Sequence, residues 1–154
     1  MIQFWNIQRL KERIRAGGIS EQEAFGYLLV WLVIFPVLGA LGAPEIVSST
    51  MWVSFAAYWV IFAIGLYFAY RENGGAQGKD FTTKFLSIGF VESIRFLPAT
   101  LLGVALVITL NLTFYSEVMA DTNWYAVTPF EIVIMGGISI AYIWRVIVHI
   151  GEVK

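Results

Sequence analysis

Four long apolar runs dominate the chain and are separated by short polar segments. They cover about residues 25–43, 51–70, 97–115 and 130–148. Each run is close to the roughly 20 apolar residues that an α-helix needs to cross the hydrocarbon core of a bilayer. The pattern therefore predicts an all-α integral membrane protein with four transmembrane helices.

Two of these predicted helices begin with a recognisable capping pattern. Ser20 and Glu23 form S-x-x-E before the first run. Thr128 and Glu131 form T-x-x-E before the fourth run, with Pro129 at the first helical position. A Ser or Thr in this pattern accepts a hydrogen bond from the backbone N–H three residues later, which fixes the start of a helix.

The segment before the first run has the pattern of an amphipathic helix. Its apolar and aromatic side chains alternate with basic ones, which are Arg9, Lys11, Arg13 and Arg15. This combination is typical of a helix that lies at the membrane interface and contacts anionic lipid headgroups. We therefore expect residues 1–18 to form a cytoplasmic interfacial helix and residues 19–154 to form the transmembrane domain. Docking of the N-terminal helix onto a cytoplasmic partner is the alternative.

A second polar segment, residues 81–96, precedes the third run. It is too polar for the middle of a bilayer and too apolar for a free loop. We expect a second interfacial or re-entrant helix here, and we expect Pro98 to turn the chain into the third span.

The loop before this segment is rich in glycine but does not match a phosphate-binding loop. Three residues separate Gly74 from the Gly78–Lys79 pair, where the motif needs four, and Asp80 follows in place of Ser or Thr. The sequence therefore predicts a turn at Gly74 and a helix cap at Asp80.

The basic residues are distributed on one side of the predicted topology. All ten Lys and Arg residues lie before the first run, between the second and third runs, or toward the C-terminus. The two other connecting segments, around residues 43–50 and 116–128, have none. By the positive-inside rule both termini are expected in the cytoplasm, with the protein integral to a plasma membrane such as a bacterial inner membrane.

A cleaved signal peptide is the alternative interpretation of the N-terminal region, because a basic stretch is followed by an apolar run that ends in GALGA. The leading region is longer than a signal peptide requires and contains Glu12, Glu21 and Glu23. We therefore expect the first run to be a membrane helix.

The amino-acid composition excludes several classes of catalytic and metal-binding site. Only 14% of the residues are charged, against about 25% in soluble proteins. The chain has no cysteine and a single histidine, His149, which excludes disulfides, thiolate catalysis and bis-histidine haem ligation within one chain. No catalytic triad or metal cluster is visible. We expect no enzymatic activity, no metal, no cofactor and no nucleic-acid partner.

Glu92 and Arg95 are the most conspicuous polar pair near the apolar runs. Three residues apart on a helix, their side chains are neighbours and can pair at the boundary of the membrane. The alternative is a buried gating or ion-binding role for Glu92.

Other polar candidates lie in the third and fourth runs. Glu131, Tyr142, Arg145 and His149 share one helical face, and Asn111 is the most polar group in the outer half of the third run. These residues are expected to face neighbouring helices, with a proton or ion path as the alternative.

Two hypotheses for function follow. The first is a non-enzymatic membrane protein that acts as a self-assembling or accessory subunit of a membrane complex. The second is a small oligomeric ion channel or transporter whose intramembrane polar residues line a pathway. In both cases the expected partners are the lipid bilayer and either copies of the chain or a larger complex.

Overall fold

The computed structural model describes the backbone of residues 5–41, 49–115 and 128–153, and the side chains of residues 5–31, 56–115 and 128–153. All regular elements in these ranges are helical. They are α1 (Ile7–Arg15), α2 (Glu21–Leu41), α3 (Ser49–Glu72), the short 3-10 helix η1 (Gly75–Gln77), α4 (Phe81–Phe114) and α6 (Pro129–Glu152).

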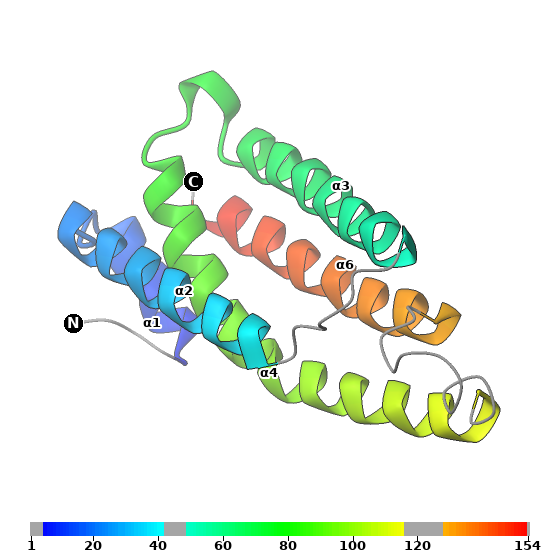
Figure 1. Cartoon of the computed structure of the whole chain (residues 1–154). Helices are drawn as coiled ribbons and strands as arrows, with labels where there is room; N and C mark the ends of the chain where they lie inside the picture. The colour runs from blue at the N-terminus through cyan, green and yellow to red at the C-terminus, as the bar shows by residue number, and fades with distance from the viewer. Residues whose placement is uncertain (1–4, 42–48, 116–127, 154) are drawn as a thin grey trace.

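Helix α6 lies between two neighbours and packs against both α4 and α3 (Figure 1). Helix α4 is bent in its middle, and its two halves run in different directions (Figure 1). Pro98 lies inside this helix, where it removes one backbone hydrogen bond and its ring clashes with the preceding turn, so it is the physical cause of a bend. Helices α1 and α2 pack on α4.

The first half of α4 is the centre of the molecule. Ser87 to Glu92 are buried without interruption, and Tyr27 of α2 packs on Phe90 with ring centroids 5.3 Å apart. Leu10 of α1 and Val146 of α6 belong to the same core. The mixed polarity of residues 81–96, which predicted a separate interfacial helix, therefore has another cause. Protein surrounds this segment, and it is continuous with the apolar run that follows it.

The second half of α4 and the first half of α6 expose large apolar side chains. Leu102 is 72% exposed and Val133 is 73% exposed. A narrow buried stripe of Gly103, Val107 and Asn111, spaced four residues apart, runs along this half of α4. A side chain at Gly103 would collide with Ile138 of α6, so the two helices are in close contact here.

The prediction of four transmembrane helices is contradicted. Within the described residues, two helices are long and apolar enough to cross a membrane, namely α4 and α6. Parts of the other two predicted spans, residues 32–43 and 51–55, lie outside the side chains that the structure describes, so neither α2 nor α3 is among these two helices. The two qualifying helices indicate association with a membrane.

Several local predictions are confirmed. The Ser20 and Thr128 hydroxyls accept hydrogen bonds from the backbone N–H of Glu23 and Glu131, so both capping patterns start helices. Gly74 has φ of 100° and ends α3, as the predicted turn requires. Asp80 precedes α4 but its side chain makes no capping hydrogen bond, so the predicted cap is wrong there. The predicted loop around residues 116–128 falls almost wholly outside the described residues.

Candidate functional site

Glu92 is the centre of a set of charged side chains from three helices. It is only 1% exposed, and its Oε1 accepts a hydrogen bond from the Arg95 guanidinium at 2.7 Å, one turn later on α4. Its Oε2 lies 3.8 Å from Nε of Arg145 on α6. The predicted Glu92–Arg95 pair therefore forms, and a second arginine from a neighbouring helix joins it.

His149 of α6 lies between two carboxylates. Its Nδ1 is 2.9 Å from Glu152 Oε2 and forms a hydrogen bond, and its Nε2 is 3.2 Å from Glu92 Oε1. Nε2 has no partner with hydrogen-bond geometry among the described residues, so the contact with Glu92 is electrostatic.

Helix α1 joins the same set through Glu152. Lys11 is buried, and its Nζ lies 2.6 Å from Glu152 Oε2. The guanidinium of Arg15 donates a hydrogen bond to the backbone carbonyl oxygen of Glu152 at 2.8 Å. Cations are favourable at this position because the last carbonyl groups of a helix carry partial negative charge. We call Glu92, Arg95, Arg145, His149, Glu152 and Lys11 the charge cluster.

Three of the four basic residues near α1 thus contact other parts of the chain, whereas the sequence predicted that they contact lipid headgroups. Besides Lys11 and Arg15, Arg13 pairs with Glu23 at 2.8 Å and bonds to the Gly18 carbonyl oxygen. Arg9 is exposed. The apolar side of α1 is also covered, because Ile7 and Leu10 are buried in the core. Its role at a membrane surface stays a prediction.

The ion pairs of the charge cluster hold α1, α4 and α6 together, and we call this arrangement the ion-pair clamp. Two carboxylates are held by three permanent cations and one imidazole, and each contact joins two different helices except the Glu92–Arg95 and His149–Glu152 pairs. In the part of the chain that the structure describes, no group of His, Asp and Glu side chains is arranged to hold a metal ion.

No protein-family model, curated protein or solved structure matches the chain. Residue roles therefore follow from the geometry of the chain itself.

The structure brings some of the predicted site residues together and separates others. Tyr142 lies beside the charge cluster, where its hydroxyl donates a hydrogen bond to the Gly89 carbonyl oxygen at 3.1 Å and its ring packs on Phe96. Glu131 lies in the first turn of α6, about three turns before Tyr142. Asn111 lies near the end of α4. These last two residues are not part of the cluster.

Asn111 belongs to a different polar environment. It is buried, and its Oδ1 has no hydrogen-bond partner among the described residues. The hydroxyl oxygen of Tyr58 on α3 is also buried and has no hydrogen-bond partner among the described residues. An unsatisfied buried polar atom costs about 1–3 kcal/mol, so such atoms require an explanation in terms of water, a ligand or function.

Sequence reasoning missed two side-chain contacts. Glu152 is the hub between α6 and α1, and its only signal in the sequence is the spacing of three residues from His149. Lys84 is buried at the start of α4, where its Nζ donates to Asn73 Oδ1 at 2.9 Å and closes the turn after α3. No local pattern indicates that contact, because it depends on how the turn folds back on α4.

Replacement of Glu92 by Gln is expected to destabilise the fold by about 3 kcal/mol, the low end of the range for breaking a buried ion pair. The low end applies because Arg95 and Arg145 are partly exposed and can turn to water. The measurement is the unfolding midpoint in mixed detergent micelles. Glu21→Gln is the control, since Glu21 is exposed on α2. Equal midpoints for both variants would contradict the clamp.

Replacement of Lys11 by Met is expected to loosen α1 from the ends of α4 and α6. A hydrogen bond to a charged group contributes about 1.5 kcal/mol, so amide hydrogen exchange within α1 should speed up roughly tenfold. The matched control is Arg9→Met on the exposed side of the same helix. The clamp loses support from α1 if exchange in the Lys11 variant equals that in the control.

Proposed function

We propose that the protein is a non-enzymatic integral membrane protein that serves as a self-assembling or accessory subunit of a membrane complex. One observation carries the proposal. The charged side chains of the cluster are matched within the chain, whereas large apolar side chains of α4 and α6 face outward. A surface of this kind is suited to contact with lipid and with other apolar helices.

The orientation belongs to the same proposal. Helix α1, the first half of α4 and the C-terminal ends of α3 and α6 lie at the same end of the molecule (Figure 1). Lys11, Arg71, Lys84 and Arg145 are all on these segments. The positive-inside rule favours the cytoplasm for this end, and with it the N- and C-terminal regions.

The mass of the gently solubilised protein tests the proposal. We expect native-source protein, extracted in mild detergent, to migrate as a complex larger than the 17.3 kDa chain plus its micelle. Multi-angle scattering of the purified particle would distinguish a homo-oligomer from a complex with foreign subunits. A monomer across all mild extraction conditions would contradict a subunit role.

A small channel or transporter is the second candidate, and one observation favours it. Asn111 Oδ1 and the Tyr58 hydroxyl are buried polar atoms without partners among the described residues, and such atoms are where water or a solute would be bound. Glu92 supports this candidate less than the sequence suggested, because Arg95 and Arg145 already hold its two oxygens.

Solute flux into liposomes separates the two candidates. A channel or transporter with Asn111 in its path should show flux that falls at least tenfold in Asn111→Leu, since the amide would no longer hydrogen-bond to the solute or its water. Thr113→Val is the control, because Thr113 is exposed on the same helix. Absence of wild-type flux under all ion and pH gradients would leave the subunit proposal as the function.

A further inference from the structure

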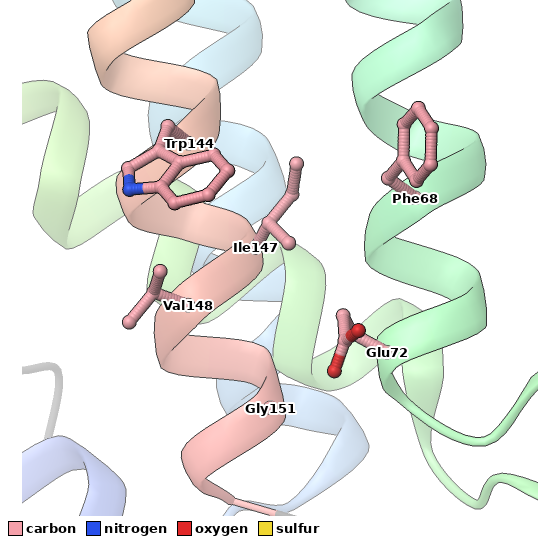
Figure 2. A pocket seen from close by; sticks show the side chains of 6 residues that line it. All are labelled: Phe68, Glu72, Trp144, Ile147, Val148 and Gly151. Carbon is pink, nitrogen blue, oxygen red and sulfur yellow. The ribbon is translucent and has the colours of Figure 1, made fainter.

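A groove lies between α3 and α6, at the end where both helices terminate. It has a volume of about 430 Å³ and is lined by Phe68 and Glu72 of α3 and by Trp144, Ile147, Val148 and Gly151 of α6 (Figure 2). This volume lies in the range of about 300–1,000 Å³ that small-molecule sites occupy. The groove does not include any member of the charge cluster.

The polarity of the groove changes along its length. Phe68 and Trp144 form the apolar end, and Figure 2 shows the Glu72 side chain directed into the space between the two helices near Gly151. Glu72 is the last residue of α3, and Gly151 is the last but one of α6. The polar end therefore coincides with the transition from apolar helix to charged helix end, which is the depth of lipid headgroups.

Gly151 keeps the polar end open. A Cβ at this position would lie 3.2 Å from Glu72 Oε2, so any larger side chain would fill the space beside the carboxylate. About two turns deeper, Gly65 of α3 has the opposite role. A side chain there would overlap Ile143 of α6, so the two helices are in direct contact at that level and the groove is closed below Phe68.

We propose that this groove binds one phospholipid with a primary-amine headgroup, such as phosphatidylethanolamine. The ammonium contacts the Glu72 carboxylate, and an acyl chain lies along Phe68, Ile147 and Trp144. A carboxylate has about four lone-pair sites, so Glu72 can accept from an ammonium in addition to other contacts. The exposed Arg71 at the same end of α3 supplies positive charge for the lipid phosphate.

Charge complementarity selects this lipid over others. An anionic lipid such as phosphatidylglycerol has no cation for Glu72, and the choline group of phosphatidylcholine has no N–H to donate to a carboxylate. A second copy of the chain is also disfavoured, because a symmetric contact would bring two Glu72 carboxylates together. The proposal requires a membrane location but not the subunit role.

The test is native mass spectrometry of the full chain in mild detergent, after incubation with equal amounts of phosphatidylethanolamine, phosphatidylcholine and phosphatidylglycerol of the same acyl composition. We expect the wild type to retain one phosphatidylethanolamine in preference to the others. Glu72→Gln keeps the volume and removes the charge, so the preference should fall about fivefold, as expected for an ion pair near a surface. Glu21→Gln is the matched control.

A second variant tests the groove itself. Gly151→Leu should abolish retention of all three lipids, and Gly137→Leu on the same helix should not, because a Cβ at Gly137 meets no atom within 4 Å. Circular dichroism verifies helix content in each variant. Equal retention of the three lipids by the wild type, an unchanged preference in Glu72→Gln, or a dimer whose groove excludes lipid would overturn the proposal. The first two of these results do not depend on whether a larger complex exists.

Discussion

The near-complete removal of Glu92 from water is the constraint on which the rest of this structure depends. A carboxylate buried to this extent is costly unless cations and hydrogen bonds replace its hydration. Arg95 can do so from the same helix, but Arg145 can do so only if α6 lies directly against α4. The burial of Glu92 and the packing of α6 on α4 therefore depend on each other, because the cation from α6 reaches Glu92 only when the two helices are in contact.

This requirement extends to α1 through Glu152. The same carboxylate oxygen contacts His149 and Lys11, so the position of an N-terminal helix is fixed by a residue near the C-terminus. Buried apolar residues alone would hold α1 with little directional preference. Lys11 and Arg15 add direction, because a salt bridge and a hydrogen bond to the end of α6 are satisfied in only one placement of the helix.

Much of the local structure could be predicted from the sequence, because its causes are local. The caps at Ser20 and Thr128 and the turn at Gly74 depend on residues within three or four positions, and all three form. The prediction of four membrane-crossing helices is contradicted, because two helices in the described part of the chain are long and apolar enough to cross a membrane. The central place of the first half of α4 was also missed. Its polar residues resemble those of an interfacial helix, and only the three-dimensional arrangement shows that other helices surround them.

Helix α6 connects the two polar features of the molecule through its opposite faces. His149 and Val146 face the core, whereas Ile147, Val148 and Gly151 line the groove beside α3. A rotation of this helix that opened the charge cluster would also displace the wall of the groove, because side chains one or two residues apart lie on different faces of the same rigid helix. Occupancy of the groove by a lipid would oppose that rotation and so stabilise the ion pairs around Glu92. The bilayer would then stabilise the fold through a specific contact in addition to its role as an apolar solvent.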